Sequence, residues 1–355
     1  MKQLLQLFRL SIITSLVILG NIVSGVEPEL AMIPYDSPDP TAIETPDGFV
    51  YVFTTRPGIA ISRSKDLVHW EPVGRVFAEV APEWARERIP KAKNVWAPDI
   101  TFHHGRYHLY YSVSTFGSQR SVIGLATNAT LDPESPNYRW IDEGLVLESD
   151  PQYTDYNAID PALLVDHDGR TYLYWGSYWR GLRAVEVDAA TGKPQSYRDP
   201  QTVGGLQIPS GEVVVAKRID HGDSSIEAPY VVHRGDFYWL FTSRGSCCDG
   251  VKSTYHIVVG RSDSPLGPFV DRDALRLDEG FGTLLLESTD RWKGTGHNGI
   301  VQTTAGDGTK RDWIILAAYD AKRPNLGRLT QLRSITFPTD AAGWLEISEI
   351  YRLPE

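Results

Sequence analysis

The chain has 355 residues, 41% of them hydrophobic, and a formal net charge of −10 at neutral pH. An acidic chain without a basic stripe argues against nucleic acid as a partner, and a neutral substrate fits it better than a polyanion. The hydrophobic fraction is sufficient for a packed core. The 17 Tyr and 10 Trp suit strands and, where exposed in a cleft, the apolar faces of sugar rings.

Residues 1–25 have the composition of a secretory signal peptide. Lys2 and Arg9 form a basic start, an apolar run covers residues 10–20, and small residues follow at 23–25. The alternative is an uncleaved membrane anchor, for which the apolar run is short. Cleavage would change the net charge to −12, because it removes two basic residues and no acidic one. We expect a secreted protein, extracellular or periplasmic, that does not contact the membrane after cleavage.

A short pattern recurs five times in the remaining chain. Each copy starts with a carboxylate or histidine among small residues and proline, and continues into a glycine turn and an aromatic strand. The turn-and-strand segments are residues 47–53, 104–111, 168–175, 234–241 and 307–316. The turn glycines Gly48, Gly105, Gly169, Gly235 and Gly308 are 57, 64, 66 and 73 residues apart. Repeats of this size are typical of a β-propeller.

Further strands are expected at residues 59–62, 122–126, 182–187 and 255–260, and hardly any segment has a helical period. The sequence therefore predicts an all-β fold, a five-bladed β-propeller that forms a single domain over residues 26–355. We expect this domain to be a monomer.

The first residue of each copy is a candidate for a shared site. The innermost strand of every propeller blade runs along the central channel, so its residues converge on one axis. This geometry would bring together Asp39, Asp99, Asp160, Glu227 and His297. For any single one of them, the alternative is local turn chemistry, which also favours Asp and Pro. The occurrence of the whole series in register favours a shared site, in which we expect Asp39, Asp160 and Glu227 to carry the chemistry and Asp99 to be structural beside Trp96.

Converging carboxylates are suited to glycoside hydrolysis, which needs one carboxyl group as acid and a second as base or nucleophile. Glu227 lies among apolar residues and proline, which would raise its pKa and keep a proton available. Asp39 lies in a more polar loop and would stay ionised as a base. A third carboxylate can raise the pKa of the acid by repulsion.

In this order, several motifs resemble those of glycoside hydrolase family 43, and within it the arabinanases. They lie at residues 95–100, 110–117, 123–127, 156–161, 175–179, 226–230, 246–250 and 296–299. The resemblance implies hydrolysis of α-1,5-linked L-arabinan, the side chain of pectin, within the chain and with inversion. It implies Asp39 as general base, Glu227 as general acid, and Asp160 as the residue that modulates the pKa of the acid and positions substrate. Inversion leaves room for a water, so we expect the base and acid carboxyls to be about 6.5–9.5 Å apart.

The resemblance also implies a set of residues along the sugar subsites: Asp39, Trp96, Phe116, Gly117, Asn157, Asp160, Ser177, Tyr178 and Trp179. Aromatic rings can stack on furanose faces, and Asn and Ser can bond hydroxyl groups. For any single aromatic residue the alternative is core packing. The sequence departs from the family at Pro38, where a histidine is common, which removes one expected hydrogen bond to substrate.

A metal ion, usually calcium, is implied near His297. Calcium prefers oxygen ligands, so a site with one imidazole would be completed mostly by water. The alternative is an interior histidine with protein partners.

Three other functions stay open. One is an exo-acting arabinofuranosidase or xylosidase of the same family, and another is a non-catalytic carbohydrate-binding propeller. The third is a retaining fructan hydrolase, which Arg198-Asp199-Pro200 superficially resembles although it falls outside the predicted inner strands.

Cys247 and Cys248 are the only cysteines and are adjacent in the chain. They are either reduced or joined in a strained ring, because neighbouring Cα atoms are only about 3.8 Å apart.

Overall fold

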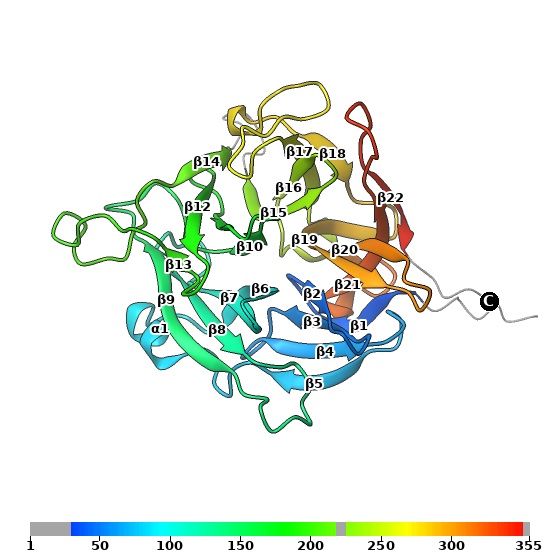
Figure 1. Ribbon diagram of the computed structural model, residues 1–355, viewed down its shortest axis with the longest axis horizontal. Helices are drawn as coiled ribbons and strands as arrows, with labels where there is room; N and C mark the ends of the chain where they lie inside the picture. Colours follow the sequence, from blue (N-terminus) through cyan, green and yellow to red (C-terminus); the bar gives the residue numbers. More distant parts are fainter. Residues whose placement is uncertain (1–29, 218–224, 351–355) are drawn as a thin grey trace, which may run out of the picture.

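The structure is a computed structural model that describes residues 30–217 and 225–350, so the predicted signal peptide lies outside the described residues. Five antiparallel sheets surround one axis, with strands β2, β6, β10, β15 and β19 nearest to it (Figure 1). This arrangement confirms the predicted five-bladed β-propeller.

Blades 1 to 3 follow one another along the chain. Blade 1 consists of β2 (Thr41–Glu44), β3 (Val50–Thr54), β4 (Ala60–Ser64) and β5 (Glu71–Arg75). Blade 2 consists of β6 (Val95–His103), β7 (Arg106–Val113), β8 (Ser121–Asn128) and β9 (Ile141–Ser149). Blade 3 consists of β10 (Ala162–Val165), β11 (Thr171–Trp175), β12 (Leu182–Asp188), β13 (Lys193–Pro194) and β14 (Val213–Ala216).

Blades 4 and 5 complete the ring. Blade 4 consists of β15 (Ile226–Arg234), β16 (Phe237–Arg244), β17 (His256–Ser262) and β18 (Thr283–Leu286). Blade 5 consists of β19 (Trp292–Thr304), β20 (Lys310–Asp320), β21 (Arg328–Thr336), β1 (Met32–Asp36) and β22 (Glu346–Ile350). The helical segments of the described residues are short: α1 (Glu83–Arg88), η1 (Gly250–Lys252), η2 (Leu277–Glu279) and η3 (Pro324–Leu326). Their scarcity agrees with the predicted lack of helical periodicity.

The two ends of the described chain close the ring on blade 5. Both β1 and β22 pair antiparallel with β21, with Met32 opposite Gln331 and Ile347 opposite Ile335. The last blade is therefore completed by strands from both ends of the described chain, which the repeat pattern did not predict.

The hydrophobic core is divided among the interfaces between neighbouring blades. Strand β3 illustrates the cause, since successive side chains of a strand point to opposite faces. Val50 and Val52 pack in a cluster with Trp313 of blade 5, whereas Tyr51 and Phe53 pack in a cluster with residues of blade 2. Both faces of such strands are buried. Burial of each large apolar side chain stabilises the folded state by about 1.5–3 kcal/mol. This packing holds the inner strands, and the residues at their ends, in fixed positions.

The predicted turn glycines are all in the left-handed region, with φ between 61° and 83°. At Gly48, Gly105, Gly169 and Gly308 an added Cβ would meet nothing within 4 Å, so the backbone angle and not space requires glycine there. Within the described residues, no helix has the length and apolar composition needed to cross a membrane. Cys247 and Cys248 form a disulfide bond, which resolves the alternative left open by the sequence.

Candidate active site

One residue at the start of each inner strand has a left-handed backbone. These residues are Asp39 (φ 53°), Ala97 (φ 42°), Asp160 (φ 57°), Ala228 (φ 53°) and His297 (φ 51°). Such angles are uncommon for residues other than glycine and are costly unless the surroundings fix them. In blades 2, 4 and 5 the strand register shifts at the same place, as in a β-bulge. A bulge redirects side chains, and the side chains of Asp39, Asp160, Glu227 and His297 lie close enough for their charges to interact.

Hydroxyl groups of the preceding blade support three of these residues. Thr55 Oγ1 accepts a hydrogen bond from the Ala97 N–H at 2.7 Å, and Ser112 Oγ accepts one from the Asp160 N–H at 2.9 Å. Ser243 Oγ accepts one from the His297 N–H at 2.9 Å. The fold thus provides a partner for a backbone donor that the bulge removes from the ladder.

The junction between blades 3 and 4 is built differently. Gly176 occupies the position of Thr55, because its N–H donates to Ile159 O as the Thr55 N–H donates to Pro38 O. Glycine has no hydroxyl, and the Ala228 N–H donates instead to Asp160 Oδ2 at 3.1 Å. The carboxylate of Asp160 therefore fixes the backbone next to Glu227.

Asp39 has two basic side chains beside it, Arg328 and His297. Arg328 Nη1 donates to Asp39 Oδ1 at 2.7 Å, and His297 Nδ1 lies 3.5 Å from the same oxygen. Burial would raise the pKa of Asp39, but Arg328 and then His297 outweigh it and hold the pKa below its usual value. Asp39 is therefore ionised at neutral pH.

The pKa of Glu227 is shifted in the opposite direction. Tyr255 Oη donates to Glu227 Oε1 at 2.6 Å and Ser177 Oγ donates to Oε2 at 2.9 Å. Burial raises the pKa of Glu227 and the charge of Asp39 adds to this, whereas the two hydrogen bonds act in the other direction. The side chain is only partly shielded from solvent, so it can still reach a ligand.

Asp160 is coupled to both of the other carboxylates. Burial raises its pKa well above the usual value, and the charges of Glu227 and Asp39 raise it further. Two buried carboxyls that interact in this way titrate as a pair, and ionisation of one makes ionisation of the other harder. The site thus combines a carboxylate of lowered pKa with a pair of carboxyls of raised pKa.

Residues 31–345 match the family described as Glycosyl hydrolases family 43. The chain belongs to this family. It is 39% identical over 300 residues to the extracellular exo-α-(1→5)-L-arabinofuranosidase of Cellvibrio japonicus, covering 84% of this chain and 83% of that protein. It is 35% identical over 294 residues to the extracellular endo-α-(1→5)-L-arabinanase 1 of Bacillus subtilis, covering 82% of each. The solved structure of Cellvibrio cellulosa α-L-arabinanase complexed with arabinohexaose has a TM-score of 0.78 and 36% identity, covering 89% of this chain and 96% of that chain.

The aromatic residues predicted to line subsites differ in exposure in this family 43 hydrolase. Phe116 is 82% exposed and Tyr178 is 37% exposed, whereas Trp96 and Trp179 are half-buried. An exposed Phe contributes little to the core, so Phe116 is free to stack on a sugar. Exposed Gly117, beside Phe116, has a φ of 77° and leaves the surface around the ring open.

The predicted polar subsite residues Asn157 and Ser177 are both buried. Asn157 accepts a hydrogen bond from Ser121 Oγ at 2.6 Å through its Oδ1. Ser177 forms an isolated bridge with Glu227 in addition to its side-chain bond. Ser177 is thus a direct neighbour of the candidate acid.

Asp99 does not occupy the place expected from the repeat. Ala97 is the residue equivalent to Asp39, and Asp99 lies two residues further along β6. Its carboxylate is buried and accepts hydrogen bonds from Thr41 Oγ1 at 3.1 Å and from the Leu163 N–H at 2.7 Å. Asp99 therefore joins the inner strands of three blades and does not belong to the carboxylate cluster.

Sequence reasoning missed two residues that contact the candidate acid and base. Arg328 begins β21, and its contact with Asp39 spans 289 residues of chain. Tyr255 directly precedes β17, and the sequence predicted it only as an aromatic residue of a strand. Neither lies in a leading motif, and only the three-dimensional arrangement of blades 4 and 5 brings them to the site.

The surroundings of His297 offer few ligands for calcium. Asp39 is the carboxylate at ion-pair distance, and its Oδ1 already accepts from Arg328. Calcium takes six to eight oxygen ligands, and a guanidinium is an unfavourable neighbour for a cation. The protein groups described around His297 are too few to form a calcium site on their own, so the calcium ion stays a prediction and no catalytic step depends on it.

Arg198-Asp199-Pro200 lies in the connection between β13 and β14. Arg198 forms an ion pair with Glu212, and Asp199 Oδ1 accepts from the Gln201 N–H at 2.9 Å. The tripeptide is part of a surface turn, and with the family established the fructan hydrolase is excluded.

Proposed function

We propose that this family 43 glycosyl hydrolase cleaves α-1,5-linked L-arabinan within the chain, with inversion at the anomeric carbon. The observation that carries the proposal is the opposite direction of the pKa shifts of Asp39 and Glu227, whose charges interact in one cluster. A low pKa on one carboxyl and a raised pKa on the other is the combination that acid and base catalysis of glycoside cleavage requires.

In the proposed reaction, the oxygen of a water molecule bonds to the anomeric carbon while Asp39 takes a proton from that water. Glu227 donates its proton to the departing glycosidic oxygen while the old carbon–oxygen bond breaks. Both carboxyls return to their starting states by exchange of a proton with solvent. The buried carboxyl of Asp160 disfavours ionisation of Glu227 and keeps that residue in its acid form.

The substrate is proposed from the relatives. Two of them are named for action on α-(1→5)-linked L-arabinose, and a third was solved with arabinohexaose. Because one of the two is named exo and the other endo, similarity alone does not select between these modes. Exposed Phe116 and Tyr178 support endo action, since they leave stacking surfaces accessible on the loops of blades 2 and 3.

Secretion of a monomer is part of the proposal. Both of these relatives are named extracellular, and residues 1–25 have the features of a signal peptide. A secreted hydrolase would meet arabinan outside the cytoplasm.

The test is the early product profile on linear α-1,5-arabinan, with the anomeric configuration of the first products followed by NMR. Mixed oligosaccharides and initial inversion are expected. A single short product would mean exo action, and initial retention would contradict the assigned roles. Glu227→Gln serves as the inactive control, and binding of arabinan by the wild type without sugar release would make the protein a non-catalytic binding propeller.

A further inference from the structure

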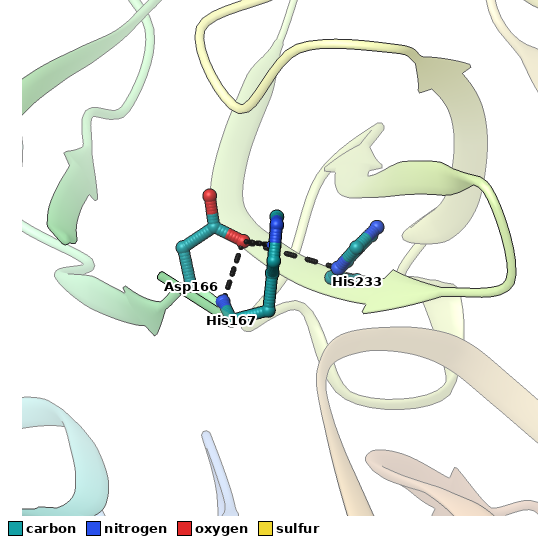
Figure 2. Close-up of side chains that lie close together, drawn as sticks. All are labelled: Asp166, His167 and His233. Carbon is teal, nitrogen blue, oxygen red and sulfur yellow. Dashed lines mark hydrogen bonds and ion pairs between the residues drawn. The ribbon is translucent and has the colours of Figure 1, made fainter. Parts of the chain in front are cut away.

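A second cluster of titratable side chains lies at the other end of the inner strands, between blades 3 and 4. Asp166 directly follows β10, His167 is the next residue in the β10–β11 turn, and His233 is near the end of β15. Figure 2 shows Asp166 and His167 facing His233 across the blade junction. Asp166 and His233 are each six residues beyond Asp160 and Glu227, which corresponds to about 20 Å along an extended strand. The cluster is therefore separate from the candidate active site.

The three side chains bring one oxygen and two nitrogens close together. His167 Nδ1 is 2.8 Å from Asp166 Oδ1, and His233 Nδ1 is 3.8 Å from the same oxygen. All three ligand atoms lie within 4.8 Å of one another, and this is the one such group found in the described part of the chain. Ligand atoms about 2.0–2.2 Å from a shared zinc ion would be separated by similar distances.

The carboxylate of this cluster is fixed in the manner of a supported metal ligand. The Asp166 side chain is 1% exposed, and Tyr238 Oη donates to its Oδ1 at 2.9 Å and to its Oδ2 at 2.8 Å. The ring of Tyr238 also stacks on His233 with centroids 4.3 Å apart, which sets the orientation of that imidazole. Partners that orient ligands are typical of metal sites. His167 is 70% exposed, which leaves a path for an ion and freedom for its ring to adjust.

The other blades show that the turn itself does not require these residues. The turns of blades 1 and 5 have the same backbone hydrogen bonds as the turn of Asp166, with Thr45 and Ala305 in its place. In blade 2 the position of His233 is taken by Phe102, which packs on Tyr107 at 4.7 Å as His233 packs on Tyr238. Asp166, His167 and His233 thus depart together from the repeat at a single junction.

We propose that Asp166, His167 and His233 bind a divalent transition-metal ion of the zinc class, with water completing the coordination. Two imidazoles and one carboxylate suit zinc, nickel or copper and do not suit calcium or magnesium. To bind the ion, the neutral His167 ring carries its one proton on Nε2, so the lone pair of Nδ1 faces the ion and the ion takes the place of the hydrogen between Nδ1 and Asp166. Because the ligands come from two blades, the ion fastens the inner hairpin of blade 3 to that of blade 4, and it takes no part in glycoside cleavage.

The test uses untagged, chelator-treated protein without reductant, so that Cys247 and Cys248 remain bonded. Zn²⁺ is titrated by calorimetry, and Co²⁺ is added to record the absorption of a four-coordinate site. We expect one ion per chain and a rise in Tm of about 3 °C at saturating Zn²⁺. His233→Phe keeps the stack on Tyr238 and should weaken binding by about tenfold or more. His167→Ala, in the exposed turn, should do the same without a loss of folding.

His69→Ala is the matched control, because His69 Nδ1 pairs with Asp66 at 2.6 Å and no second imidazole is grouped with that pair in the described residues. It should leave zinc binding unchanged, as should His297→Ala at the other end of the channel. Neither His233→Phe nor His167→Ala should alter arabinan hydrolysis. Absence of saturable binding, or equal binding by wild type, His167→Ala and His233→Phe, would overturn the proposal.

Discussion

Two junctions between blades differ in the group that accepts a hydrogen bond from the N–H of the left-handed residue. They are the junction between blades 2 and 3 and the junction between blades 3 and 4. At the first, the hydroxyl of Ser112 accepts from the N–H of left-handed Asp160. At the second, Gly176 has no side chain, and the Asp160 carboxylate accepts from the N–H of left-handed Ala228. Asp160 is therefore supported on one side and gives support on the other.

This difference shows how a repeated fold acquires a reactive site. A hydroxyl accepts this hydrogen bond without adding an ionisable group, whereas the carboxyl of Asp160 in the same position also places a second titratable group beside Glu227. The cost of burying that group is visible in its pKa, which burial and then Glu227 and Asp39 raise well above the usual value. The blade 3–4 junction thus combines support of the backbone with tuning of the acid, and its substitutions should affect both.

The largest effect is expected from Glu227→Gln, which keeps the shape of the side chain and removes the transferable proton. On arabinan, kcat/KM should fall by about 10³-fold, within the range usual for loss of a general acid. A substrate with an activated aryl leaving group needs less protonation, so its loss should be much smaller. Comparison of kcat/KM on the two substrates is the measurement, and equal losses on both would show that Glu227 is not the acid.

Two substitutions of Asp160 separate its role as acceptor for the Ala228 N–H from its electrostatic effect on Glu227. Asp160→Asn retains an oxygen for the Ala228 N–H but loses the negative charge, and a fall in kcat/KM of about 10²-fold is expected. Asp160→Ala loses both and should be worse. Without the charge of Asp160 the acid ionises more easily, so the basic limb of the pH profile of Asp160→Asn should move to lower pH. An unchanged basic limb would mean that Asp160 acts on the backbone alone.

Ser112→Ala removes the hydroxyl acceptor at the junction between blades 2 and 3. It leaves the Asp160 N–H buried without a partner, at a cost of about 1–3 kcal/mol in the free energy of unfolding. Displacement of Asp160 should also lower kcat/KM by about tenfold. The control is Thr171→Val, which removes a buried hydroxyl at the other end of blade 3, where Thr171 Oγ1 donates to Val187 O at 2.8 Å. Denaturation and kinetics on both variants are compared, and an equal activity loss in the control would assign the effect to general destabilisation.

The local motifs were sufficient to predict the fold and the proximity of the three carboxyls, because a propeller brings residues that recur along the sequence to one axis, whereas their catalytic roles stay predictions. Asp39, Asp160 and Glu227 could be found since each lies in its own repeat. The mistaken equivalence of Asp99 arose from aligning the repeats on acidic residues. Alignment on the proline that follows each left-handed residue in blades 1 to 4 would have placed Ala97 opposite Asp39.

The remaining parts of the site could not be predicted for a physical reason. Arg328 and Tyr255 reach Asp39 and Glu227 from strands or loops with no distinctive spacing, and only the packing of whole blades determines those contacts. The pairing of β1 with β21 is equally non-local, since it joins opposite ends of the chain. Sequence period predicts which strands are innermost, but the register between blades depends on side-chain packing over the entire ring.

Asp99→Asn should have the smallest effect on activity and should show that not every inner-strand carboxylate is catalytic. Burial raises the pKa of Asp99 to about 7 from an ordinary value of 3.8, despite the hydrogen bonds from Leu163 and Thr41. Because the folded pKa is the higher one, the contribution of Asp99 to stability is fully present below about pH 4 and is lost as the pH rises through 7. Asparagine does not titrate, so the Tm of Asp99→Asn minus that of wild type should increase between pH 5 and pH 8, while kcat/KM changes little. A Tm difference that stays constant over this range would show that Asp99 is ionised throughout. A large loss of kcat/KM in a folded variant would show that Asp99 acts in the active site and does not only connect the inner strands of three blades.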